Sequence, residues 1–365
     1  MKSRFACSAL ICVTGMACTF PAPAEIVSLA GSVEAQIIEY YIGKERDSDN
    51  VYDVFPETSA ELPLQVVARL VSPEGLAGDL TEEAAASVGA QFADPRTVST
   101  PNPEEFAINL ALHSISPHIH YEAQASSCET RGVNYAPGEL GLFARDGDAV
   151  QLIGRLFLDG ALTLFAADAD QDLTGAYVRL NVTVWQYVEE QDEKIVFEGA
   201  VELTGTANGE VEVNVDGDFP TNRLVLSDLS VTASRFDVFR VLILPNMTIN
   251  YNFDAVVGQE FTLEACVDVE AANLPNGIGV AAILGTPTDT LIDVIDLTTD
   301  AQTASQFVSK ITEERANPTG DSVFPAVGGW PFLPACGVLG MESVLGFVAL
   351  AGFRATTRRG LVIRK

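Results

Sequence analysis

The chain has 365 residues, with 50 acidic and 21 basic side chains and a formal net charge of −29. Nucleic acids are bound through basic surfaces, so this charge excludes them as partners. A field this negative favours solubility, high-salt surroundings or divalent cations. The length between the terminal segments leaves open one large domain or two smaller ones.

Residues 1–24 have the composition of an export signal. Lys2 and Arg4 precede an apolar stretch, residues 5–17, and Ala22-Pro23-Ala24 matches the small-x-small pattern of a signal-peptidase site. We therefore expect cleavage after Ala24 and a mature chain that is exported from the cytoplasm.

Residues 25–148 are expected to form an N-terminal β-rich region with one short helix. An alternating apolar stretch lies within 26–42, and short β-type runs cover 64–70 and 106–112, which predicts strands. The pattern from Leu80 to Phe92 predicts a helix, with Asp79 and Glu82 placed as in a capping box.

All three histidines fall within eight residues: His113, His118 and His120. In an extended segment, residues two apart point to the same face, so His118, His120 and Glu122 would share one side. With His113 or Glu122 as a third ligand, the group predicts a zinc or copper site. A solvent-facing strand explains the same residues without a metal.

Residues 149–317 are expected to form a β-sandwich, either alone or as one domain with the preceding region. Short apolar runs recur about every ten residues and are separated by turn signals such as Asp159-Gly160, Asp216-Gly217 and Leu244-Pro245-Asn246. This spacing is typical of an antiparallel sandwich or jelly roll. One further helix is predicted over 303–315, and residues 318–335 are predicted to be a Pro/Gly-rich stalk.

Two features of this region are candidate binding sites. Asp168, Asp170 and Asp172 alternate in a loop, which suggests a calcium site, although Leu173 stands where an EF-hand loop needs glycine. A solvated acidic turn is the other interpretation. Trp185 and Tyr187 alternate on one strand and could stack against sugars, or they could belong to the sandwich core or its rim.

Three cysteines remain in the mature chain: Cys128, Cys266 and Cys336. In an oxidising compartment, Cys128 and Cys266 could form a disulfide between the two halves of the body, worth about 4 kcal/mol in the loop-entropy model. Two separate buried thiols are the alternative.

The C-terminal segment, 336–365, has the layout of a sorting and anchoring signal. Cys336-Gly337 is followed by the apolar run 338–353 and then by a basic tail containing Arg354, Arg358 and Arg359. With the preceding apolar residues, the run is long enough for a transmembrane span. Basic residues after it are expected to stay on the cytoplasmic side. A last buried element of the domain is the other interpretation.

The order of short motif, apolar span and Arg-rich end resembles the bacterial PEP-CTERM class, which is processed by exosortase-like peptidases. Residues 330–337 stand at the motif position, with Cys336-Gly337 in place of Pro-Glu-Pro. The resemblance implies a sorting peptidase as a partner and makes Cys336 a candidate processing or lipidation site. With its regular strands, the whole layout also resembles surface proteins of the choice-of-anchor type, and this implies a β-rich body outside the cell.

Together these features predict an all-β, antiparallel sandwich or jelly roll with two short helices, a signal peptide and a C-terminal transmembrane anchor. No Gly-x-Ser-x-Gly, phosphate-binding loop or His-Glu-x-x-His motif occurs. The expected function is therefore non-enzymatic: structural, adhesive or matrix-binding contact with an extracellular polysaccharide or surface protein. The alternative is a secreted metal-dependent hydrolase or oxidase that uses His113, His118 and His120.

Overall fold

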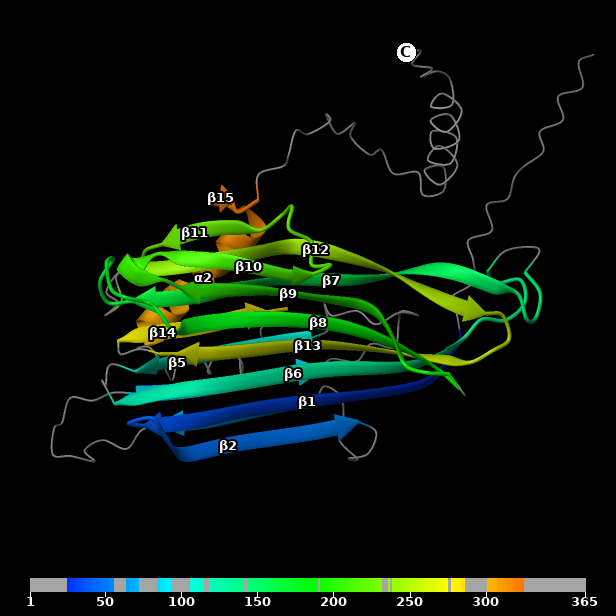
Figure 1. Ribbon diagram of the computed structural model, residues 1–365, viewed down its shortest axis with the longest axis horizontal. Coiled ribbons are helices and arrows are strands. Elements are labelled where there is room, and N and C mark those ends of the chain that lie inside the picture. Colours follow the sequence, from blue (N-terminus) through cyan, green and yellow to red (C-terminus); the bar gives the residue numbers. More distant parts are fainter. Residues whose placement is uncertain are drawn as a thin grey trace, which may run out of the picture. The chain divides into compact units, whose positions relative to one another are not determined.

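Two antiparallel β-sheets account for most of the computed structural model (Figure 1). It describes residues 25–55, 64–71, 84–92, 106–114, 118–140, 144–189, 191–231, 236, 238–274, 277–285 and 301–324. The two sheets bury apolar side chains between them, so the predicted all-β, sandwich-like class is confirmed.

The first sheet has seven strands. Their spatial order is β10 (Val211–Gly217), β9 (Lys194–Gly205), β8 (Ala176–Val188), β13 (Phe261–Asn273), β6 (Ile119–Asn134), β1 (Glu25–Tyr41) and β2 (Lys44–Phe55). Strands β10 and β2 are its edges, and β13 and β6 lie near its centre.

The second sheet has eight strands. Their order is β15 (Asp321–Ser322), β11 (Val225–Leu229), β12 (Val238–Val256), β7 (Ala149–Ala166), β14 (Ile278–Leu284), β5 (Phe106–Ser114), β4 (Ala84–Phe92) and β3 (Leu64–Val71). Each sheet contains strands from both sides of residue 148, so the two predicted regions share one core.

The alternation of side chains along β8 shows how the core is built. Val178, Leu180, Val182 and Val184 are buried between the sheets, whereas the residues between them face outward. Each fully buried Val or Leu contributes about 1.5–3 kcal/mol. A shift of the strand by one residue would exchange the two faces, so this burial holds the register of the polar outer side.

The predicted helix over 80–92 is wrong, because residues 84–92 form strand β4. This strand pairs along its length with β3 on one side and β5 on the other. Ala86, Val88 and Ala90 point into the core and are fully buried. Two neighbouring strands satisfy the backbone groups, and this tertiary context overrides the helical propensity of alanine. Asp79 and Glu82 lie outside the described residues.

Two predicted turns are also wrong, because they lie inside long strands. Asp159-Gly160 is continuous with β7, and Pro245-Asn246 lies within β12. The register of the β7–β12 pair shifts between Leu244 and Met247, and Asn246 has a φ of 37°. A bulge accommodates the proline, which cannot donate a ladder hydrogen bond.

Helix α2 (Ala301–Ala316) covers part of the outer face of the eight-stranded sheet and confirms the helix predicted over 303–315. Phe307 and Ile311, one turn apart, are buried in a second apolar cluster. The ring of Phe307 stacks on that of Phe239 of β12, with centroids 5.5 Å apart.

The start of the predicted stalk belongs to the body. Residues 318–324 follow α2, and β15 pairs with β11. Glu314 holds this turn, since its carboxylate accepts hydrogen bonds from the Thr319 N–H (2.9 Å), the Thr319 hydroxyl (2.6 Å) and the Ser227 hydroxyl (3.1 Å). Burial opposes ionisation, but these hydrogen bonds keep the pKa of Glu314 below its ordinary value. Residues 325–335 lie outside the described residues.

Strands β2 and β3 lie at neighbouring edges of the two sheets. Strand β2 has the sequence KERDSDNVYDVF, in which charged residues are frequent. The Asp49 carboxylate of β2 accepts a hydrogen bond from the backbone N–H of Arg69 on β3, at 2.8 Å. A side chain of one sheet thus satisfies an edge N–H of the other.

Candidate functional site

The structure does not bring the three histidines together. His113 lies on β5 of the eight-stranded sheet, where its buried ring meets the edge of Phe236 at a centroid distance of 5.9 Å. His118 and His120 lie on or beside β6 of the other sheet. No three of the described side chains His113, His118, His120 and Glu122 place ligand atoms within 4.8 Å of one another. The predicted zinc or copper ligand set is therefore not assembled.

The alternation predicted for His118, His120 and Glu122 is correct. Ile119 and Tyr121 between them are buried, so the three polar residues share the outer face of the seven-stranded sheet. His120 stacks on Tyr40 of β1 with ring centroids 4.8 Å apart. Burial lowers the pKa of His120, with an opposing effect from Glu122.

The acidic loop between β7 and β8 is an anchored turn. Asp168, Asp170 and Asp172 are exposed, and they do not place three carboxylate oxygens within 4.8 Å of one another in the described structure. Asp172 accepts a hydrogen bond from the Thr174 backbone N–H at 2.9 Å, and hydrogen bonds from Thr174 lower its pKa. Leu173, at the position where an EF-hand loop needs glycine, is buried in the main core. The carboxylates therefore surround a turn held by Leu173.

Cys128 on β6 and Cys266 on β13 are directly opposite each other and are joined by a disulfide. Together with Glu264 they are the one group of three potential metal ligands found among the described residues. A thiolate is the metal-binding form of cysteine, and neither sulfur is a thiolate in the disulfide.

The predicted terminal features lie outside the described residues. These are the cleavage site at Ala24 and the anchor residues Cys336, Gly337, Arg354, Arg358 and Arg359. Within the described part of the chain, no helix combines the length and the apolar character needed to cross a bilayer.

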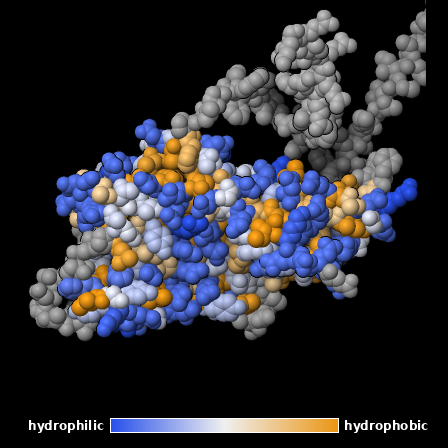
Figure 2. Space-filling view, viewed as in Figure 1, coloured by the Kyte–Doolittle hydropathy of each residue, from blue (hydrophilic) through white to orange (hydrophobic). Residues whose placement is uncertain are grey.

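The outer face of the seven-stranded sheet carries polar side chains across its whole width. Because antiparallel pairing places opposite residues side by side, one row crosses every strand. From β2 to β10, this central row consists of Asn50, Gln36, Gln124, Glu270, Arg179, Glu202 and Asn214. Figure 2 shows this face as mainly hydrophilic, with scattered hydrophobic patches.

Two further rows flank the central row. One contains Tyr52, Glu34, Ser126, Asp268, Asn181, Ala200 and Asp216. The other contains Ser48, Ile38, Glu122, Ala272, Tyr177, Thr204 and Glu212. The three rows therefore combine carboxylates, amides, hydroxyls and tyrosine rings with a single guanidinium group.

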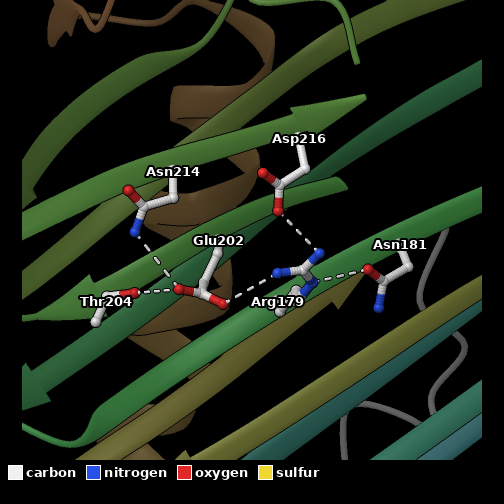
Figure 3. Close-up of polar contacts among 6 residues, drawn as sticks. All are labelled: Arg179, Asn181, Glu202, Thr204, Asn214 and Asp216. Atoms are coloured by element: carbon white, nitrogen blue, oxygen red, sulfur yellow. Dashed lines mark hydrogen bonds and ion pairs between the residues drawn. The ribbon is translucent and has the colours of Figure 1, made fainter. Parts of the chain in front are cut away.

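Arg179 organises the side of this face nearest β10 (Figure 3). Its Nε donates to Asn181 Oδ1 at 2.8 Å, and its two terminal nitrogens contact Glu202 (3.5 Å) and Asp216 (3.0 Å). Glu202 also accepts a hydrogen bond from the Thr204 hydroxyl at 2.6 Å. Side chains from three strands are thereby held in fixed positions.

A groove of about 510 Å³ lies beside Arg179. Ala200 of β9 contributes little side-chain volume on the outer face, and the surface is hollowed between β10 and β13. The groove is lined by Gln124, Arg179, Asn181, Thr183, Glu198, Gly199, Ala200, Asp216, Gly217, Asp268 and Glu270. A second hollow of about 170 Å³ shares Gln124 and Glu270 with it and extends to Tyr177. The two hollows follow the rows across the sheet, and we refer to them together as the sheet groove.

The electrostatic environment of the sheet groove is negative. Burial raises the pKa of Asp268, and the neighbouring carboxylates of Glu270 and Glu34 raise it further, against a hydrogen bond from Ser126. The pKa of Tyr177 is raised by burial and then by nearby carboxylates, including Glu270. Both shifts have the direction expected where negative charge accumulates.

Arg179, Asp268 and Glu270 were not identified as site residues from the sequence. Each occupies an outward position of an alternating strand, and alternation was the only available signal. That signal cannot show that strands β8 and β13, about eighty residues apart in the chain, are neighbours.

Comparisons with known proteins identify no family. No protein-family model and no curated protein match the chain. The VP2 subviral particle of infectious bursal disease virus is 13% identical, with a TM-score of 0.11, over 80% of this chain and 73% of that chain. T=1 particles derived from the same virus give 11% identity and a TM-score of 0.10, over 80% and 71%. Scores this low do not support a shared fold.

Proposed function

We propose that this chain is an exported protein, anchored in the cell envelope or on the cell surface, that binds extracellular matrix polysaccharide without acting on it. The observation that carries the proposal is the sheet groove in a polar face that spans seven strands. Polysaccharides present rows of hydroxyl groups, and amide and carboxylate side chains are suitable partners for them.

Anchoring is proposed from the termini. The export signal before Glu25 and the apolar run with the basic tail after Gly337 would leave the body outside the membrane. A surface position would expose the sheet groove to the matrix.

The predicted alternative, a metal-dependent hydrolase or oxidase, requires several ligands around one ion. His113 lies on a different sheet from His118 and His120, so no feature of the described geometry favours that function. A calcium ion at Asp168, Asp170 and Asp172 remains a prediction, which a chelator-induced change in melting temperature would support.

Sedimentation with insoluble matrix polysaccharide, prepared from cells that make the protein, tests the proposal. The full-length chain in detergent should sediment with the matrix. Ala200→Gln, which fills the groove without changing charge, should weaken binding, and Gln124→Ala should weaken it about fivefold through the loss of roughly 1 kcal/mol of hydrogen bonding. Gln151→Ala, an exposed change on β7 of the other sheet, is the matched control. Failure to sediment, or unchanged binding by Ala200→Gln, would refute the proposal.

A further inference from the structure

We infer that the ligand of the sheet groove is a linear polysaccharide with free amino groups, such as a partly deacetylated amino-sugar polymer, which lies across the strands with its ammonium groups against Asp268 and Glu270. This inference rests on the proposed function and specifies its ligand.

The charge of the face favours a cationic partner. The three rows contain seven carboxylates and one guanidinium group, that of Arg179. Arg179 already contacts Glu202 and Asp216. No cationic side chain of the described residues forms an ion pair with Asp268, Glu270 or Glu34. A ligand with positive charges would compensate them.

The spacing of these carboxylates suits an extended ligand better than a metal ion. Calcium requires oxygen atoms that converge at roughly 2.3–2.6 Å from one point. In the described structure, no three carboxylates of the sheet groove come within 4.8 Å of one another. They are instead distributed along rows, and with strands about 4.8 Å apart the seven-stranded row is roughly 29 Å long. A polymer with repeated charges matches this arrangement.

The other side chains of the groove favour a sugar polymer over a basic peptide. Gln36, Gln124 and Asn181 provide amide groups for hydroxyls, and the half-buried ring of Tyr177 offers an apolar surface against which a sugar ring can pack. An extended peptide commonly binds by adding a strand to a free sheet edge. Here most of the groove lies over β1, β6, β13, β8 and β9, whose backbone groups are already paired on both sides, and it reaches the edge strand β10 only at Asp216 and Gly217.

Binding of polymers of matched length to the full-length chain in detergent tests the inference, at mildly acid pH where the amino groups are protonated. The deacetylated amino-sugar polymer should bind at least about tenfold more tightly than its fully acetylated form, and added salt should weaken it. The double variant Asp268→Asn/Glu270→Gln should abolish that preference. Glu313→Gln, an exposed change on α2, should preserve it.

The outcomes separate this inference from the proposed function. Equal binding of both polymers, with Ala200→Gln still weakening each, would overturn the amino-sugar inference and leave matrix binding intact. Tighter binding of polylysine than of the amino-sugar polymer would also overturn it, in favour of a basic polypeptide. Binding of no polysaccharide at all would refute both proposals.

Discussion

Removal of the Cys128–Cys266 disulfide should cost several kcal/mol of stability. The bond connects β6 and β13 across 138 residues of sequence. For a loop of this length, the chain-entropy relation gives about 5 kcal/mol at 25 °C, and loss of a native disulfide typically costs about 2–5 kcal/mol. The double variant Cys128→Ser/Cys266→Ser measures this contribution without leaving either cysteine of the pair as an unpaired thiol.

The free-energy loss can be converted into a melting temperature. Unfolding entropy is about 2.1 cal/mol/K per residue, so residues 25–324 have roughly 0.6 kcal/mol/K, and the double variant should melt roughly 3–8 °C lower. Circular dichroism during heating measures the shift. In urea, the double variant should also show a steeper transition, since its unfolded chain is no longer cross-linked and exposes more surface.

A reductant provides the internal control. It should lower the melting temperature of the unchanged chain by about the same amount and leave the double variant unaffected. The loop-entropy reasoning would be refuted if the reduced chain, with both thiols shown to be free, melted within about 1 °C of the oxidised chain.

Two further substitutions test the charge and the packing described above. The pKa of Asp268 is raised in the folded chain, so the folded state loses stability as the pH rises from about 3.8 through that pKa. Asp268→Asn should therefore raise the urea midpoint at neutral pH and leave it unchanged near pH 3. A lower midpoint at neutral pH would contradict this. Gly279→Ala places a Cβ into the ring of Phe165 and should cost about 1–3 kcal/mol, measured by urea unfolding, with partial recovery when Phe165 is also changed to Leu. An unchanged midpoint would show that the ring moves freely.

The parts of the fold that follow from local pattern could be predicted. Strand β8 alternates buried valines with polar residues, and α2 carries Phe307 and Ile311 one turn apart, so each element has a periodicity visible in the sequence. The disulfide could be proposed but not decided, because only the pairing of β6 with β13 places the two cysteines opposite each other.

The parts that depend on distant pairing could not be predicted. Residues 84–92 contain four alanines, and only their position between β3 and β5 makes them a strand. The sheet groove has the same origin, since Gln36, Gln124 and Glu270 become neighbours through a strand order that no local pattern records. His113 illustrates the opposite case, because closeness in sequence to His118 did not place it on the same sheet.

The hydrogen bond from the Arg69 N–H to Asp49 has a consequence for copies of the chain held close together. An exposed sheet edge offers unpaired backbone groups on which another chain can add a strand, and fibres grow in this way. Here β2 carries many charged residues, and the carboxylate of its Asp49 accepts a hydrogen bond from a backbone N–H on the neighbouring β3 edge. Crowded molecules should therefore not join by strand addition at the β2 and β3 edges.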